Sequence, residues 1–240
     1  MIAETGIWAL VPAAGFGARM QAELPKQYLP LQGRPVLLHT LERLCRYPRL
    51  RGVIVGIAEG DAHWVRVSAE AGRLRNFLGS YHGGETRART VLNGLRALAE
   101  HSRSGDWILV HDAVRPCLRE KDLDRLIEAV GGGMDGGVLA VPVSDTVKRA
   151  DTQDRILETV ERAGLWRALT PQMFRREQLT AALEKVLNEG GDVTDESMAV
   201  ERLGGRPRIV VGHPDNIKIT YPNDLAQADL FLTLQAEGRS

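Results

Sequence analysis

The sequence predicts an α/β fold with a Rossmann-like, mostly parallel sheet, helices on both faces of that sheet, and a protruding β-hairpin arm. Several apolar runs are nearly continuous, as in IWALVPAA (7–14), which is typical of strands buried on both faces. Segments with apolar residues at helical spacing alternate with these runs, which favours parallel strands joined by right-handed crossovers. One polar segment, 144–162, interrupts the alternation.

The predicted strands and helices follow from these two patterns. In the segment 35–47, Val36, Thr40 and Leu44 recur at helical spacing after an initial proline. The predicted strands are 7–14, 51–58, a short one near Tyr81 that ends at Gly83-Gly84, 107–113, 136–143 and 206–213. The predicted helices are 35–47, 64–74, 85–101, 122–130, 175–189, 195–203 and one from about 222.

The arm is predicted at 144–162, where polar and apolar residues alternate around a turn at Asp151–Asp154. The segment has too few apolar residues to enter the main core, and an isolated hairpin is only marginally stable. We therefore expect it to pack on another surface, and a second copy of the chain is the simplest candidate. This predicts one domain over residues 1–240, with a dimerisation arm.

Composition narrows the class of protein. The chain has 240 residues, of which 43% are hydrophobic and 26% charged, as expected of a globular domain. Lys+Arg and Asp+Glu both number 31, so a dedicated nucleic-acid or membrane-surface partner is not expected. The N-terminal stretch has no basic region and carries Glu4, and no stretch is long and apolar enough for a membrane helix. We expect a cytoplasmic protein with two reduced cysteines, Cys45 and Cys117.

The stretch VPAAGFGARM after the first strand indicates a phosphate-binding loop. Gly15 and Gly17 are too close for a P-loop, and Met20 replaces the third glycine of a dinucleotide fingerprint. A nucleotidyltransferase loop, in which backbone N–H groups approach a triphosphate, fits better, since Arg19 and Lys26 supply positive charge. A tight strand-to-helix turn without a ligand is the alternative.

The stretch HDAVRPCL contains the second candidate site. Asp112 lies at the C-terminal end of a strand so apolar that it must be central, and ligands bind at that edge of open α/β sheets. A hydrated Mg²⁺ on a nucleotide would suit a single carboxylate, and Arg115 could hold a second phosphate. The alternative is structural: Asp112 caps the turn and Arg115 pairs with it. His111 and Asp112 are adjacent on the strand and point to opposite faces, so they are not a catalytic pair.

Other candidate residues have structural alternatives. Lys218 lies in an apolar, β-like segment, where it either binds an anion or protects a sheet edge. Thr194 is a good helix N-cap, with Asp195 and Glu196 in the first turn. Gly84, Glu85 and Thr90, taken alone, are turn and helix-start residues.

Taken together, these stretches resemble the 2-C-methyl-D-erythritol 4-phosphate cytidylyltransferase family of the non-mevalonate isoprenoid pathway. The resemblance covers nearly the whole chain in order. The first block is shared with many nucleotidyltransferases, whereas TPQ, VTDE and NIK are far more specific. The matching stretches are VPAAGFGARM…PKQYLPLQGRPVLLHTL, HDAVRP, GLWRALTPQMF, VTDES and DNIKIT.

The resemblance implies a role for each matching position. Catalytic charge would come from Arg19, Lys26 and Lys218, and Asp112 would hold Mg²⁺. The CTP site would comprise Pro12, Ala13, Ala14, Gly15, Gly17, Gly84, Glu85 and Thr90. Methylerythritol phosphate would be surrounded by Arg115, Thr146, Arg162, Thr170 and Thr194. The family is a homodimer, and Arg162 on the arm would serve the neighbour's site. Glu85 and Thr90 replace a common aspartate and serine, which keeps the carboxylate and the hydroxyl.

Two other functions stay open from the sequence. A ribitol-phosphate or other sugar-phosphate cytidylyltransferase differs from the favoured function only in its acceptor. A CTP-sensing regulatory module belongs to another class, and it would not need a second phosphate site. Lys218 and the arginine-rich second pocket argue against a sensor.

Overall fold

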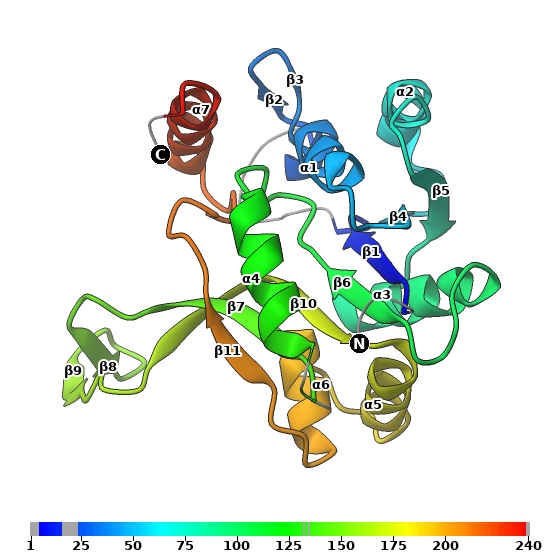
Figure 1. The fold of residues 1–240 in the computed structure, drawn as a ribbon. Helices are drawn as coiled ribbons and strands as arrows, with labels where there is room; N and C mark the ends of the chain where they lie inside the picture. Colours follow the sequence, from blue (N-terminus) through cyan, green and yellow to red (C-terminus); the bar gives the residue numbers. More distant parts are fainter. Residues whose placement is uncertain (1–4, 16–23, 132, 134, 239–240) are drawn as a thin grey trace.

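A seven-stranded sheet forms the centre of the computed structural model, which describes residues 5–15, 24–131, 133 and 135–238 (Figure 1). The strand order is β11-β7-β10-β6-β1-β4-β5. The strands are β1 (Ile7–Pro12), β4 (Gly52–Ile57), β5 (Phe77–His82), β6 (Trp107–Val110), β7 (Gly137–Pro142), β10 (Trp166–Arg175) and β11 (Arg208–Val211). Only β10 runs antiparallel to its sheet neighbours, so the prediction of a mostly parallel sheet is confirmed.

Helices cover both faces of the sheet, as predicted. The core on one face joins α1 (Val36–Arg46), α2 (Ala62–Ala71) and α4 (Glu120–Val130) to the strands. The core on the other face joins α3 (Arg87–Ala97), α5 (Arg176–Asn188) and α6 (Glu196–Arg202). A third, smaller core packs α7 (Asn223–Ala236) beside the start of α1.

Strand β1 shows why the apolar runs are continuous. Ala9 and Val11 belong to the core on the α1 side of the sheet, whereas Trp8 and Leu10 belong to the core on the α3 side. Successive side chains of a strand point to opposite faces, so a central strand needs apolar residues at every position.

Strand β10 is the strand of the central sheet that the sequence patterns do not predict. It contains Pro171, which cannot donate a ladder hydrogen bond and argues against a central strand. The structure accommodates this proline with a shift in the register between Ala168 and Gln172. The strand pairs with β6 on one side and β7 on the other.

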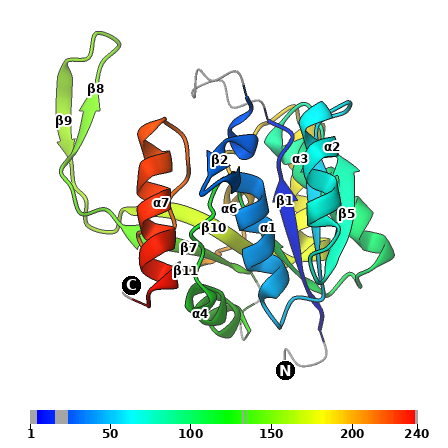
Figure 2. The ribbon, with the colours of Figure 1, turned by 90° about the horizontal axis from the view of Figure 1, so that it is seen from above.

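The predicted arm is present and stands away from the rest of the molecule (Figure 2). Strands β8 (Val147–Ala150) and β9 (Ile156–Val160) pair antiparallel in a two-stranded sheet of their own. The carboxylate of Asp151 stabilises the turn by accepting from the backbone N–H groups of Gln153 and Arg155. Ile156 and Leu157 are 65% and 62% exposed, so the arm presents apolar side chains to its surroundings.

Some element boundaries differ from the prediction. The predicted helix 85–101 is shorter, because α3 begins at Arg87 and continues after Ala97 only as the 3₁₀ turn η3 (Leu98–Glu100). The predicted strand 107–113 ends at Val110. A 3₁₀ turn η2 (Lys26–Tyr28) and a small β2–β3 pair (Pro30–Leu31 and Arg34–Pro35) precede α1 and were not predicted. Within the described part of the chain, no helix is long and apolar enough to span a membrane.

Candidate active site

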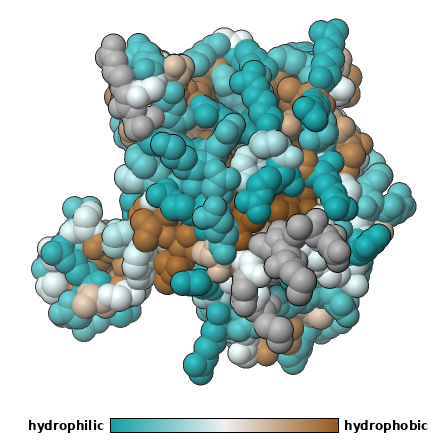
Figure 3. All heavy atoms as spheres, in the orientation of Figure 1, coloured by the Kyte–Doolittle hydropathy of each residue, from teal (hydrophilic) through white to brown (hydrophobic). Residues whose placement is uncertain are grey.

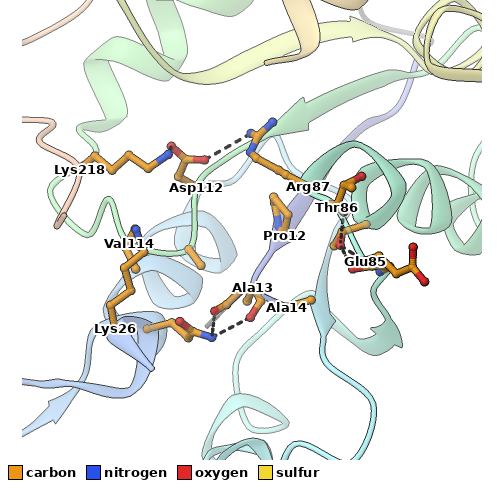
Figure 4. Close-up of a pocket in the computed structure, with 15 residues that line it drawn as sticks. Pro12, Ala13, Ala14, Lys26, Glu85, Thr86, Arg87, Asp112, Val114 and Lys218 are labelled. Carbon is orange, nitrogen blue, oxygen red and sulfur yellow. Dashed lines mark hydrogen bonds and ion pairs between the residues drawn. The ribbon is translucent and has the colours of Figure 1, made fainter. Parts of the chain in front are cut away.

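A cavity of about 250 Å³ lies where β1 and β6 end, at the sheet edge that the sequence predicts for a ligand (Figure 4). Three segments far apart in the chain build most of it: the turn after β1, the start of α3, and the turn after β6. The lining residues are Pro12, Ala13, Ala14, Gly15, Lys26, Gln27, Gly84, Glu85, Thr86, Arg87, Thr90, Asp112, Ala113, Val114 and Lys218.

The turn after β1 is held by a residue that sequence reasoning missed. The amide nitrogen of Gln27 donates to the carbonyl oxygens of Ala13 (2.8 Å) and Gly15 (3.0 Å). Gln27 is 4% exposed, so these bonds are shielded from water and fix the backbone at the cavity wall. The predicted residues Gly17 and Arg19 lie outside the described residues.

The start of α3 forms the opposite wall. The Thr90 hydroxyl accepts from the backbone N–H of Gly84 (3.0 Å) and donates to the carbonyl oxygen of Thr86 (3.0 Å). A side chain at Gly84 would bring its Cβ within 2.6 Å of the Cβ of Arg89, so this turn requires glycine. Thr90 is 2% exposed and shapes the wall from within. A direct contact between Thr90 and a nucleotide stays a prediction.

Asp112 is surrounded by three cationic side chains. Its carboxylate lies 3.0 Å from Lys218 Nζ, 3.2 Å from Arg115 Nε and 3.3 Å from Arg87 Nη2. Burial alone would raise the pKa of this carboxyl group, but Arg87, Lys218 and Arg115 outweigh burial and hold the pKa well below its usual range. Asp112 is therefore an ionised carboxylate inside a strongly positive environment.

Arg115 follows the structural alternative that the sequence left open. It is 7% exposed and does not line the cavity. Its Nε donates to Asp112 and its Nη1 to the carbonyl oxygen of Asn216 (2.7 Å). In this structure Arg115 therefore supports Asp112 from behind. A contact between Arg115 and a phosphate stays a prediction.

Thr170 also lies behind Asp112. Its hydroxyl accepts from the backbone N–H of Asp112 (3.0 Å) and lies 3.0 Å from His111 Nδ1. His111 Nε2 lies 3.0 Å from the carbonyl oxygen of Arg115, which can only accept, so Nε2 carries the proton. It follows that Thr170 donates to His111 Nδ1. Both bonding directions of the Thr170 hydroxyl are used to hold the turn after β6.

Burial makes His111 neutral. Desolvation lowers its pKa to about 4, and the favourable hydrogen bond to the Arg115 carbonyl does not compensate. His111 is thus a fixed structural donor and acceptor at ordinary pH. His111 faces this buried network and is not among the residues that line the cavity.

The N-cap of α6 corrects one sequence prediction. Asp195, not Thr194, caps the helix: its carboxylate accepts from the backbone N–H of Met198 (3.0 Å). Gln172 on β10 holds Asp195 in the cap position, since its amide group donates to Asp195 (2.9 Å) and accepts from the backbone N–H of Ser197 (2.8 Å). Thr194 is exposed just before the cap, and its hydroxyl donates to the sulfur atom of Met198 (3.6 Å).

Two further site residues were missed by sequence reasoning. Arg87, the first residue of α3, lines the cavity, and its guanidinium binds both carboxylate oxygens of Glu196 at the start of α6. Glu196 is 1% exposed. The two residues are 109 positions apart. Glu196 lies in the VTDES stretch, where it was assigned only to the first helical turn, and no sequence pattern pairs it with Arg87.

The predicted arm residues are separate from this cavity. Thr146 and Arg162 line a different hollow at the base of the arm, together with Thr159, Val160 and Glu161. Arg162 donates to the carbonyl oxygen of Ser144 and is exposed. Within one chain, these two side chains do not join the cavity around Asp112.

The remaining predicted residues come together as expected from the sequence. Pro12, Ala13, Ala14, Gly15, Gly84, Glu85, Lys26, Lys218 and Asp112 all line the cavity. Lys26 reaches from η2 toward the Lys218 segment, where its Nζ donates to the carbonyl oxygen of Ile219 (3.3 Å). The cavity therefore combines a glycine-containing turn, two lysines and an arginine with the carboxylates of Asp112 and Glu85, and its cationic side chains are suited to a polyanionic ligand.

Comparison with known proteins assigns the family. The sequence profile described as "2-C-methyl-D-erythritol 4-phosphate cytidylyltransferase" matches residues 7–234. The chain belongs to the 2-C-methyl-D-erythritol 4-phosphate cytidylyltransferase family. Membership makes it a nucleotidyltransferase with cytidylyltransferase activity in isoprenoid biosynthesis, and it confirms the resemblance seen in the sequence.

Individual relatives support this assignment. The 2-C-methyl-D-erythritol 4-phosphate cytidylyltransferase of Azoarcus sp. strain BH72 is 49% identical, over 94% of this chain and 93% of its own. A crystal structure of 4-diphosphocytidyl-2C-methyl-D-erythritol synthase has a TM-score of 0.82 and 38% identity, covering 95% of this chain and 99% of its own. The Francisella tularensis cytidylyltransferase structure has a TM-score of 0.79 and 31% identity, covering 95% and 100%.

The neutral, buried His111 makes the stability of this cytidylyltransferase pH-dependent. Its folded pKa is about 4, below the ordinary value near 6.5, so between these two pH values only the unfolded state takes up the proton. This group should therefore remove up to about 3 kcal/mol of unfolding free energy as the pH falls from about 6.5 to 4.

The matched variant is His111→Gln, and the measurement is urea unfolding at pH 7.5, 6.5, 5.5 and 4.5. At pH 7.5 the variant should be less stable than the parent chain, because it loses part of the Thr170 and Arg115 network. The difference should shrink toward pH 4.5, since glutamine does not titrate. Parallel stability curves for the two proteins would contradict the assigned protonation state.

Proposed function

We propose that the cavity binds CTP and 2-C-methyl-D-erythritol 4-phosphate together and transfers CMP to the latter, with release of pyrophosphate. The product would be 4-diphosphocytidyl-2-C-methyl-D-erythritol. The observation that carries this proposal is the pair of cavity cations Arg87 and Lys218 on the ionised Asp112, with Lys26 in the same cavity lining, at the ligand-binding edge of the sheet. Family membership supplies the identity of the two substrates.

The reaction needs positive charge more than it needs a base. The acceptor phosphate is already an anion, so it can attack the α-phosphate of CTP in line without losing a proton. Bringing two anions to 4 Å costs about 4 kcal/mol at an effective dielectric of about 20. Lys26, Lys218 and Arg19 would offset this repulsion and stabilise the charge that develops on the α-phosphate.

The proposed residue roles divide the site into a part that binds CTP and a part that binds the acceptor. The turn after β1 and the start of α3 would bind CTP through Pro12, Ala13, Ala14, Gly15, Gly17, Gly84, Glu85 and Thr90. The exposed Thr194 before α6 would contact the acceptor. Arg115 and Thr170 would act from behind Asp112, because the hydrogen bonds described above occupy them.

A divalent cation such as Mg²⁺ fits the donor set. Among the described residues no group of three or more His, Cys, Asp or Glu side chains is placed to hold a metal ion. Mg²⁺ is often held by only one or two carboxylates together with substrate phosphates, and Asp112 is ionised and lines the cavity. Asp112 would hold the ion against the triphosphate, where Mg²⁺ neutralises phosphate charge. Lys218, which also lines the cavity, would bind substrate phosphate oxygens.

The acceptor is tested by pyrophosphate release with a panel of polyol phosphates. We expect turnover with CTP and 2-C-methyl-D-erythritol 4-phosphate, and far less with ribitol 5-phosphate or with ATP, GTP and UTP. Preferred turnover of ribitol 5-phosphate would replace the proposed acceptor. If no acceptor in the panel gives pyrophosphate release, a CTP-sensing module would be favoured.

The role of the lysine charge is tested with Lys26→Ala. Removing one preorganised positive group should lower kcat roughly 10²–10³-fold, with little effect on the urea unfolding midpoint. Lys121→Ala, at an exposed position of α4, is the matched control and should keep kcat. Arg19→Ala should resemble Lys26→Ala. An unchanged kcat in Lys26→Ala or Arg19→Ala would refute the role of that residue.

We propose that the chain acts as one nucleotidyltransferase domain that dimerises through the arm. The arm exposes Ile156 and Leu157, and the edge strand β11 exposes Ile209 and Val211. Figure 3 shows hydrophobic surface beside the root of the arm. Thr146 and Arg162 lie apart from the cavity of their own chain, which is consistent with a contribution to the acceptor site of the partner chain. A cytoplasmic location stays a prediction from the sequence.

Deleting residues 146–160 tests the arm. The hairpin pairs only with itself, so the main sheet should fold without it. We expect a monomer by sedimentation, with circular dichroism of a folded α/β protein and no measurable turnover. Arg162→Ala in the full chain should remain dimeric but lose acceptor affinity. An active monomer would refute the shared site.

A further inference from the structure

The structure contains a buried ion pair between the two halves of the proposed site. Arg87 begins α3, whose first turn forms the nucleotide wall, and Glu196 begins α6, directly after the Thr194 segment proposed for the acceptor. Glu196 is 1% exposed and is not among the residues that line the cavity, whereas Arg87 lines it and its side chain is 28% exposed. The carboxylate therefore lies behind the guanidinium as seen from the cavity.

The two carboxylates that contact Arg87 hold it unequally. Glu196 binds it bidentately, with one of the two contacts at 3.1 Å, while Asp112 makes a single contact of 3.3 Å. A bidentate pair fixes the plane of a guanidinium as well as its position. Arg87 therefore keeps its orientation through Glu196 when Asp112 turns to another cation. Figure 4 shows Arg87 and Lys218 approaching Asp112 from opposite sides.

The contacts leave donors for a ligand. An arginine has five N–H groups, and the three contacts to Glu196 and Asp112 are those that Arg87 makes among the described residues. A charged, preorganised donor in a partly enclosed cavity stabilises developing phosphate charge without reorganising during the reaction. A carboxylate is costly to bury, so Glu196 at this position is explained by the charge that it holds in place.

From this geometry we propose that Arg87 is a catalytic residue that binds a substrate phosphate oxygen beside Asp112, and that Glu196 is a positioning residue acting through Arg87. The inference rests on the proposed function and adds two residues to it. Because the pair joins the start of α3 to the start of α6, it also fixes the distance between the nucleotide wall and the acceptor segment.

The test compares Glu196→Gln, Arg87→Gln and the double variant, with Glu201→Gln at an exposed position of α6 as the control. Steady-state kinetics give kcat and both KM values, calorimetry gives CTP binding without acceptor, and urea unfolding gives stability. Glu196→Gln should lower kcat 10- to 100-fold while the KM for CTP changes less than threefold. The double variant should have the kcat of Arg87→Gln, because Glu196 has no other route to the reaction.

Arg87→Lys separates positioning from charge. Lysine keeps the positive charge but cannot make the bidentate pair, so kcat should fall nearly as far as in Arg87→Gln. If Glu196→Gln fails to fold, Arg87→Lys still tests whether the bidentate pair is needed for turnover.

Three results would overturn the inference. One is a kcat of Glu196→Gln within twofold of the parent chain together with a lower unfolding midpoint, which would make the pair purely structural. The second is multiplicative losses in the double variant, which would separate the two residues. The third is full activity of Arg87→Lys. The parent chain is assayed in the same reaction, so a failure of the proposed function would appear there first.

Discussion

The arrangement of the site depends on keeping one buried carboxylate ionised. Asp112 is 6% exposed, and burial of an unpaired charge is unfavourable, so its environment must supply compensating cations. Three elements provide them: Arg87 from α3, Arg115 from the turn after β6, and Lys218 from the segment before α7. The attraction between these charges therefore draws three distant parts of the chain to one sheet edge.

A network of neutral hydrogen bonds beneath Asp112 also holds this carboxylate in place. Thr170 binds the backbone N–H of Asp112, and His111 connects Thr170 to the carbonyl oxygen of Arg115. Since His111 stays neutral when buried, the network adds no further charge to a region that is already strongly positive. Arg87, Lys218 and Asp112 line the cavity, whereas the neutral hydrogen bonds of Thr170 and His111 fix the turn that presents Asp112.

The sequence predicted those features that depend on hydrophobic pattern and on position at a strand end. Continuous apolar runs located the central strands, and the strand-end rule placed Asp112 at the correct edge. The patterns could not predict β10, because Pro171 argues against a strand and only pairing with β6 and β7 explains it. The N-cap was predicted at Thr194 rather than Asp195 since both residue types cap helices, and Gln172, distant in the chain, decides between them. The sequence could not predict that Glu196 of the VTDES stretch pairs with Arg87, because the two meet only in the folded chain, where α3 and α6 begin.

The reversed direction of β10 has a mechanical consequence. β7 ends at the sheet edge where β6 ends, and antiparallel β10 begins there, with Trp166 opposite Pro142. Both roots of the arm thus leave from the same rim as the reaction cavity, and no helical crossover intervenes between the arm and Thr170. The arm therefore extends from the paired strands β7 and β10. Strand β10 continues from the arm to Thr170, whose hydroxyl holds the turn after β6. A force applied to the arm by a neighbouring molecule would reach that turn through Trp166–Ala168, which pair with β7, and then through the register shift that contains Thr170.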